Sequence, residues 1–303
     1  MTLRYAASMY LASPRTLSKA LSKALFSRLV LACITLSLAI AAIPSHAGSR
    51  ILGTGGVSAI EGAAGGGLSP WAVLASTASE QEVGVTAAAT RAWVDDYRLT
   101  VTSANLNIYD RAEVSVARQT LDLETLGGEL VQDIYGAKVR LLGDVLYHPW
   151  GIWSVGLQHK RLVDGTTPTA LGADETHGTD IYLSASKLLF SAVAGRNVLL
   201  NATLRNTDAN QGGLLGFGGN QDGRSWLAEG SVGLFVTPHW IIGAEYRQKP
   251  DNLSAAREDD WQSLYSAYFF NKHLSLTGAW LDLGDIAGLS SQRGGYLSLQ
   301  AAF

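Results

Sequence analysis

Histidine is the side chain of this sequence best suited to general acid or base catalysis near neutral pH. Five histidines follow residue 47: His148, His159, His177, His239 and His273. Hydrolysis or acyl transfer also needs a serine and an orienting acid or amide within hydrogen-bond reach of the histidine. Only His159 lies well inside a predicted strand, and local spacing places no serine beside it. We therefore expect no catalytic residue, and a lipid-active enzyme is the second alternative among the functions considered below.

Charged residues also recur on alternate positions of otherwise apolar segments. Lys138 and Arg140, for example, alternate with the apolar Ala137, Val139 and Leu141. If the apolar faces point outward, the charged side chains line an interior. This candidate lumen lining consists of Glu113, Lys138, Arg140, Lys160, Arg205, Glu229, Glu245 and Arg247. Mixed charge in a pore orients polar or zwitterionic solutes; alternatively, these residues pair across strands and only make the interior polar.

Three segments outside the predicted strands are also rich in polar residues. Residues 249–252 and 257–260 carry charges that would suit a hard cation or a lipopolysaccharide headgroup, but solvated loop charges are the more common case. Residues 208–219 either fold into a lumen or form a flexible exterior loop, and we expect the exterior loop. The glycines at 216–219 are followed by no helical pattern, so they do not form a phosphate-binding loop. We expect no metal site and no cofactor.

Composition limits the class of protein. The 303 residues are 47% hydrophobic and only 16% charged, below the roughly 25% charge of a typical soluble domain. The longest apolar run, Leu29 to Ile43, is shorter than the roughly 20 residues of a transmembrane helix. A single cysteine cannot form a disulfide within the chain. The apolar residues must therefore be spread through the chain in a short period.

The N-terminal segment has the order of a secretory signal peptide. Residues 1–47 contain five basic residues and no acidic one, then the apolar run, Pro44 and Ser45-His46-Ala47. We predict cleavage after Ala47, with Met9 as a candidate internal start and lipidation at Cys33 as a minor alternative. Removing this segment takes Lys+Arg from 23 to 18 against 26 acidic residues, a net charge of −8. Such a chain has no basic surface for nucleic acid.

From residue 71 onward the dominant pattern is strict alternation, which predicts β-strands. Thirteen segments show it, near residues 71–78, 82–91, 97–108, 111–121, 130–141, 152–162, 178–188, 196–206, 224–236, 239–248, 260–270, 273–284 and 294–303. Short connections alternate with long ones at 122–129, 163–177, 207–223, 249–259 and 285–293. This asymmetry is typical of an up-and-down transmembrane β-barrel.

Aromatic residues gather near both ends of these segments, as the two interfaces of a bilayer would favour. One set includes Tyr109, Tyr147, Trp150, Phe190 and Trp240; the other includes Trp93, Tyr97, Trp226, Trp261 and Trp280. The last segment alternates strictly and ends on an aromatic residue, which resembles the signal read by the outer-membrane insertion machinery. The residues that would carry this signal are Leu297, Leu299 and Phe303.

A barrel whose two ends lie on the same rim needs an even number of strands, because its backbone must close without an edge. We predict a closed antiparallel barrel of 14 strands, with thirteen in residues 71–303 and the first supplied by the segment 48–70. The alternative is 12 strands, with that glycine-rich segment folded inward as a plug around Gly62, Gly65, Gly66 and Gly67.

Several stretches resemble a bacterial outer-membrane family catalogued as domain of unknown function 3034. They are Gly55-Gly56-Val57, Ile60 to Gly67, Asp95 to Leu99, Gly178-Thr179-Asp180, Leu200 to Arg205, Ala209-Asn210-Gln211, Gly213 to Gly219, Gly243 to Arg247, Lys249 to Leu253, Arg257 to Trp261 and Asn271-Lys272-His273. The resemblance implies an outer-membrane barrel and implies no activity.

These features together predict an outer-membrane barrel that passes or binds small solutes. A plugged structural or surface-interaction barrel without transport is the first alternative. We expect outer-membrane lipids, lipopolysaccharide and the insertion machinery as partners, an unidentified small solute as ligand, and no nucleic acid.

Overall fold

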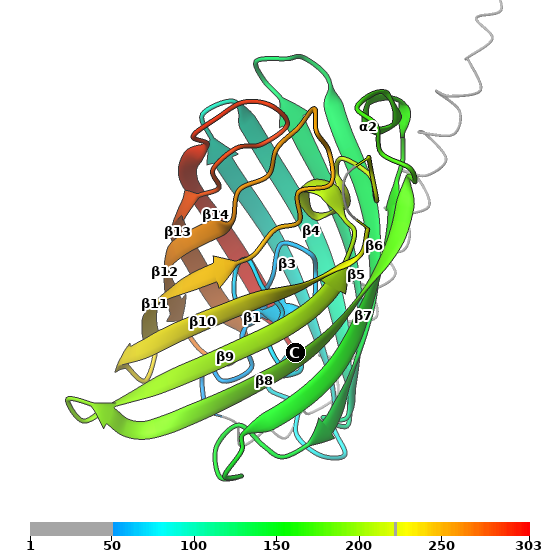
Figure 1. The fold of residues 1–303 in the computed structure, drawn as a ribbon. Helices are drawn as coiled ribbons and strands as arrows, with labels where there is room; N and C mark the ends of the chain where they lie inside the picture. Colours follow the sequence, from blue (N-terminus) through cyan, green and yellow to red (C-terminus); the bar gives the residue numbers. More distant parts are fainter. Residues whose placement is uncertain (1–50, 221–222) are drawn as a thin grey trace, which may run out of the picture.

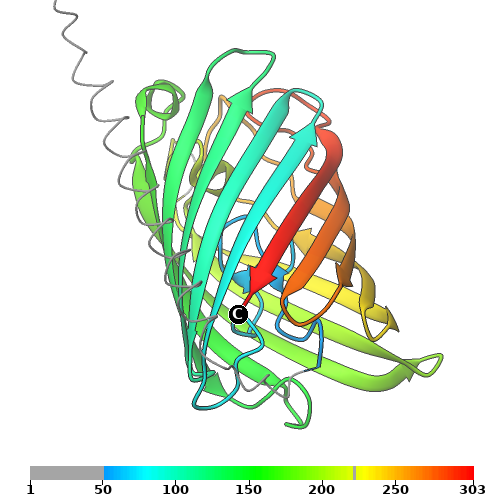
Figure 2. The same ribbon diagram turned by 180° about the vertical axis from the view of Figure 1, so that it is seen from behind.

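The computed structural model describes residues 51–220 and 223–303. Within these ranges the wall is a closed barrel of antiparallel strands that pair in chain order, and β14 closes the ring onto β3 (Figure 1, Figure 2). The wall strands are β3 (Val83–Val94), β4 (Tyr97–Ile108), β5 (Ala112–Leu123), β6 (Glu129–Leu142), β7 (Ile152–Leu162), β8 (His177–Val193), β9 (Arg196–Thr207), β10 (Ser225–Thr237), β11 (Trp240–Arg247), β12 (Trp261–Phe269), β13 (Leu274–Asp282) and β14 (Arg293–Ala302). All backbone edges of the sheet are thus paired.

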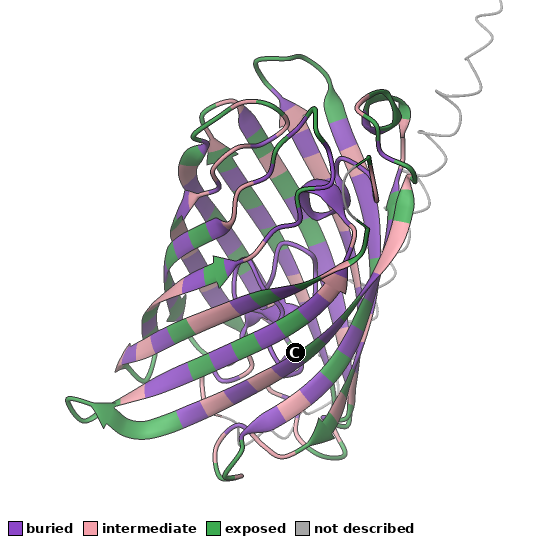
Figure 3. Cartoon of the chain, in the orientation of Figure 1, coloured by how far each residue is buried: buried purple, intermediate pink, exposed green. Residues whose placement is uncertain are grey.

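Alternation along each strand separates an inner from an outer face. On β7, Ser154, Gln158 and Lys160 are fully buried, while Val155 and Leu157 are exposed on the outside. The same alternation runs around the barrel as bands of buried and exposed residues (Figure 3). Since successive side chains of a strand point to opposite faces, the sequence period fixes which residues face the interior.

Large apolar side chains cover the outer face. Leu264, Leu297 and Tyr135, from three different strands, are each more than 40% exposed. Trp93, Trp226 and Trp280 are exposed near the rim that carries the long loops, and Tyr147, Trp150 and Phe190 near the opposite rim. The helices of the described residues are α2 (Thr166–Ala170) and the 3-10 turn η1 (Asn210–Gly213), and neither has the length or apolar character to span a bilayer.

The prediction of 14 strands is wrong, and the 12-strand alternative is correct for the described chain. Residues 57–66 do not join the wall: β1 (Val57–Ser58) and β2 (Ala64–Gly65) pair only with each other. The segment 71–78, which alternates like a strand, is also not a wall strand, so the wall begins at Val83 rather than at Trp71. Trp71 to Ala75 are at most 3% exposed, so this segment is a short apolar run buried on all sides, which resembles a strand in the sequence.

Residues 51–78, hereafter the plug, fold inside the barrel (Figure 1, Figure 3). Nearly all of them are buried, including Ala59, Glu61, Leu68 and Leu74. The backbone–backbone hydrogen bonds of this segment join plug residues to one another, as between Ala59 and Ala63 and between Ile60 and Gly67. A barrel of twelve strands is wider than the eight-stranded size that its own side chains can fill. The plug occupies that extra space.

The long loops gather at one rim, as the sequence predicts, except that Asp95 and Asp96 make a short connection there. Residues 208–219 correct another expectation: they fold inward over the lumen instead of forming an exterior loop. Asn210, Gln211 and Leu215 are at most 2% exposed. The predicted signal peptide, its cleavage site at Ala47 and Cys33 lie outside the described residues.

Candidate functional site: a plugged, charge-lined lumen

The structure places the candidate lumen lining on the inner face of the wall. Glu113, Lys138, Lys160, Arg205, Glu229, Glu245 and Arg247 are each at most 4% exposed, far below what isolated surface charges show. Arg140 also faces inward but lies close to the short-turn rim, where it pairs with Asp110 at 2.5 Å and with Glu80 at 3.3 Å. The lumen therefore holds a concentration of charge that must be compensated by close partners.

Glu61 of the plug lies at the centre of this charge. Its carboxylate is 2.5 Å from Lys160 Nζ, 2.7 Å from Arg247 Nη2 and 3.1 Å from Arg205 Nη2. These three cations come from β7, β9 and β11. A single plug carboxylate thus ties together three wall strands that are not neighbours in the sheet.

Two wall carboxylates complete the cluster. Asp180 lies 2.7 Å from Lys160 and 3.1 Å from Arg205, and Glu229 lies 2.5 Å from Arg205. Three carboxylates therefore face three cations. A balanced group of this kind is tolerated in a buried place because each charge is paired and hydrogen-bonded, whereas the loss of one partner leaves another exposed to the full desolvation cost.

A second pair holds the opposite side of the plug. Glu113 Oε1 and Oε2 accept hydrogen bonds from the backbone N–H groups of Ala64 and Ala75, at 3.0 and 2.8 Å. Lys138 Nζ donates to the carbonyls of Ala64 and Val73, at 2.9 and 2.8 Å. Backbone groups of the plug that lack sheet partners are thus satisfied by wall side chains.

A tight glycine turn of the plug rests on Glu245. This carboxylate accepts from the N–H groups of Gly67 and Leu68, at 2.8 and 3.0 Å. A Cβ atom on Gly66 would lie 1.8 Å from Glu245 Oε1, and one on Gly67 would lie 2.0 Å from the Tyr296 hydroxyl oxygen. An added Cβ would also lie 2.2 Å from the Ser69 carbonyl oxygen at Gly65 and 2.7 Å from Ala117 Cβ at Gly62, so all four candidate plug glycines have a steric reason. Gly62 has a φ of +92°, and Gly65 packs on the Ser69 carbonyl.

The inward loop closes the other end of the lumen. Lys160 Nζ donates to the Gly212 carbonyl at 3.0 Å, and Glu258 accepts from the Gln211 N–H at 2.7 Å. Glu258 also lies 3.1 Å from Lys249 Nζ, and this ammonium group sits 4.1 Å from the centre of the Trp261 ring.

Burial changes the acidity of this loop pair. It lowers the pKa of Lys249 to about 8 although Glu258 opposes the change, and it raises the pKa of Glu258. The charges expected to be solvated are therefore partly internal: Lys249 and Glu258 are buried, while Asp251 and Arg257 are exposed. Over the described residues, no group of histidine, cysteine and carboxylate side chains could hold a metal ion.

Sequence reasoning missed three members of the site. Glu61 and Asp180 anchor the charge cluster, and Gln158 accepts a hydrogen bond from Arg205 at 2.8 Å. Asp180 and Gln158 lie on the inward parity of β8 and β7, so the alternation contained the signal. Glu61 lies in a segment without any periodicity. The one signal in the sequence is that it is the sole carboxylate of the glycine-rich stretch 53–67.

The remaining candidate residues lie away from the lumen. His159 is on the outer side of β7, where its Nδ1 lies 2.9 Å from the Thr179 hydroxyl oxygen. Leu297, Leu299 and Phe303 are exposed on the outer face of the closing strand or just beyond it.

Three outer-membrane proteins of known structure are similar to this chain. The outer membrane protein Omp33 of Acinetobacter baumannii is similar over 74% of this chain and all of its own, with 12% identity and a TM-score of 0.46. The KdgM porin is similar over 72% of this chain and 99% of its own, with 9% identity and a TM-score of 0.49. Outer membrane phospholipase A of Escherichia coli is similar over 73% of this chain and 92% of its own, with 9% identity and a TM-score of 0.39.

A search of curated protein sequences finds no match. A family model described as "Protein of unknown function (DUF3034)" matches residues 54–300, which include the plug and nearly the whole wall. The chain therefore belongs to the DUF3034 family.

Proposed function

We propose that this protein is an outer-membrane barrel that binds small solutes and passes them when its plug is displaced. The membrane location is supported by the outer face of the wall. Apolar side chains cover it between two aromatic-rich rims, and over the described residues the closed ladder leaves no free sheet edge toward hydrocarbon. In water, the same face would be an exposed apolar surface far larger than soluble monomers carry.

The observation that carries the transport proposal is the way the plug is held. In residues 51–78, the backbone–backbone hydrogen bonds stay inside the segment, while wall side chains such as Glu113, Lys138 and Glu245 reach in to bind it. The plug can therefore leave its place without breaking any rung of the wall ladder. A lumen lined with paired charges of both signs would then open to water and admit polar solutes.

Conductance across a planar bilayer, with the plug free or cross-linked, tests this proposal. Ser58 of the plug donates to Gln300 of β14 at 2.8 Å, and the described residues contain no cysteine. In the S58C/Q300C double variant, a short bis-maleimide would add both cysteine thiols across its double bonds and so bridge plug and wall. We expect discrete conductance steps before bridging and their loss after it.

The S58C single variant, treated with the same reagent, is the control and should keep its conductance. If wild type, double variant and a plug-weakened E61A variant are all silent, the solute-passing function is wrong. A plugged structural or surface-interaction barrel would then be the better account.

A further inference from the structure

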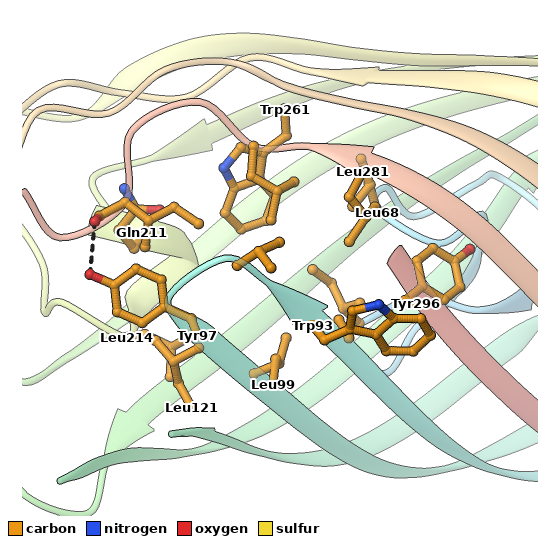
Figure 4. Close-up of a pocket in the computed structure, with 15 residues that line it drawn as sticks. Leu68, Trp93, Tyr97, Leu99, Leu121, Gln211, Leu214, Trp261, Leu281 and Tyr296 are labelled. Carbon is orange, nitrogen blue, oxygen red and sulfur yellow. Dashed lines mark hydrogen bonds between the residues drawn. The ribbon is translucent and has the colours of Figure 1, made fainter. Parts of the chain in front are cut away.

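Between the plug and the long-loop rim lies an apolar cavity of about 50 Å³ (Figure 4). The plug contributes Leu68 to its lining, the wall contributes Leu99, Leu121 and Leu281, and the inward loops contribute Leu214 and Ile286. The cavity is therefore assembled from three separate parts of the chain. It adjoins the charge cluster around Glu61, because Arg247 of that cluster lies 5.5 Å from the centre of the Trp261 ring.

The cavity is suited to an apolar occupant rather than to water. Its size is several times the roughly 10–15 Å³ that one water molecule needs, but water also requires two to four polar partners. Nearly all of its lining surface is apolar. Apolar cavities stay dry, and one of about 150 Å³ takes up benzene, so a single ring would enter this smaller cavity as its lining leucines move apart.

Two buried polar atoms at one side of the cavity lack a partner. Within residues 51–220 and 223–303, the indole nitrogen of Trp261 and Oε1 of Gln211 make no hydrogen bond, although the two residues are only 6% and 2% exposed. Figure 4 shows the Trp261 nitrogen on the side of its ring nearer to Gln211. Leaving such groups unsatisfied is costly, so an unmatched donor beside an unmatched acceptor points to a ligand group that serves both.

A third unpartnered atom, the Tyr296 hydroxyl, does not belong to this feature. It lies against the plug backbone, since a Cβ atom on Gly67 would be 2.0 Å from it. The polar recognition therefore rests on Trp261 and Gln211 alone. The two cations over the Trp261 ring already have carboxylate partners: Lys249 faces Glu258 at 3.1 Å, and Arg247 faces Glu61 at 2.7 Å. The site therefore calls for no charge on the ligand.

We propose that this cavity binds a small, uncharged, monocyclic aromatic solute with one hydroxyl group. The ring packs among the leucines, the hydroxyl donates to Gln211 Oε1, and the hydroxyl oxygen accepts from the Trp261 N–H. This inference rests on the proposed solute-binding function and names its substrate class. Because the cavity is bounded partly by Leu68 of the plug, ligand and plug are in contact.

Binding of 4-fluorophenol and of fluorobenzene, followed by fluorine NMR with the protein in lipid nanodiscs, tests the proposal against empty nanodiscs. We expect both to bind, and 4-fluorophenol about threefold to tenfold more tightly, as one or two net hydrogen bonds allow. In W261F the ratio of the two affinities should fall toward one, because the ring remains while the donor is lost.

Two variants on β3 form a matched pair. Ala92 is buried and lines the cavity, whereas Ala89 is exposed on the outer face of the same strand. A92L should fill the space and weaken both ligands at least tenfold, while A89L should leave both affinities unchanged. If A92L does not fold, L99F fills the same cavity from β4.

The substrate class is wrong if wild type binds neither ligand above the empty nanodisc, or if A92L and L99F bind as wild type does. It is also wrong if fluorobenzene binds as tightly as 4-fluorophenol. These results are independent of conductance. A protein that conducts but binds neither ligand would support solute passage and contradict the substrate class. A protein that binds 4-fluorophenol but does not conduct would support the substrate class and contradict solute passage.

Discussion

The Lys160 ammonium group lies 2.5 Å from Glu61 Oε1 and thereby joins the wall strand β7 to the plug. The same group donates to the Gly212 carbonyl of the inward loop at 3.0 Å. Two segments that enter the lumen from opposite ends thus meet at one cation. Since a buried cation needs close partners, displacing the plug or the inward loop removes a partner of Lys160 and destabilises the contact of the other segment with it. Plug and inward loop therefore stabilise each other in the lumen.

Replacing Glu61 should release the plug. The E61A variant leaves Arg247, Arg205 and Lys160 short of one carboxylate, and breaking a buried pair of this kind costs about 3–5 kcal/mol. We expect more frequent channel opening in planar bilayers and a lower urea midpoint in nanodiscs.

Glu80 provides the control for this change. It pairs with Arg140 and Arg111 near the short-turn rim, but its side chain is 71% exposed. Exposed pairs contribute about 0–1 kcal/mol, so E80A should behave as wild type in both measurements. Equal effects of E61A and E80A would contradict a locking role for the central cluster.

The wall could be predicted from the sequence almost residue by residue. The expected segments 97–108 and 152–162 coincide with β4 and β7. Alternation marks them because the outer face of each strand is apolar and the inner face is polar. The segment 71–78 alternates as well but is plug. A short apolar run buried on all sides looks like a strand, and no local signal distinguishes the two.

The site was predictable only in part, for a related reason. Inward parity identifies Glu113, Lys138 and Arg205, but it does not say what faces them. Their partners are plug atoms far away in the chain, such as the Ala64 N–H on Glu113. The contact between Glu61 and Arg247 joins residues 186 positions apart. Such pairings follow from closure of the barrel and not from any local pattern.

A methyl group on Gly66 should dislodge the tight turn of the plug. The new Cβ would lie 1.8 Å from Glu245 Oε1, so the backbone or the carboxylate must move. Overpacking of this kind costs about 1–3 kcal/mol. We expect G66A to raise protease cleavage within residues 51–78 while the wall stays folded by gel mobility. G223A is the control, because no atom of the described residues lies within 4 Å of its added Cβ. If G66A is cut no faster than G223A, the steric account fails.

An arginine on the outer face should test the lipid contact. Leu264 is 60% exposed in the middle of β12, where it faces Ala244 and Trp280 of the neighbouring strands. Arginine on the lipid face of a transmembrane barrel costs about 2–4 kcal/mol at the midplane and about 0–1 kcal/mol near an interface, and the pairing of Leu264 with Trp280 of the long-loop rim places its cost between these limits. We expect L264R to lower the folded fraction in phospholipid vesicles. Leu126 is 57% exposed in the loop after β5, so L126R makes the same change at similar exposure outside the wall. An equal loss in both variants would argue against a membrane at β12.

The buried Lys249 should make the stability depend on pH above neutrality. Its pKa is lowered to about 8 by burial, against 10.5 for the unfolded chain, so between these values the unfolded state binds more protons. The free energy of unfolding contributed by Lys249 therefore rises as the pH increases from 8 to 10.5, by at most about 3 kcal/mol.

K249M removes this titration, and we expect its unfolding free energy to rise less than that of wild type over the same window in urea titrations. K272M removes a cation at the opposite rim and should keep the wild-type slope. A wild-type curve that falls with pH relative to K249M would show that the ammonium form is favoured in the folded protein, contrary to the effect of burial.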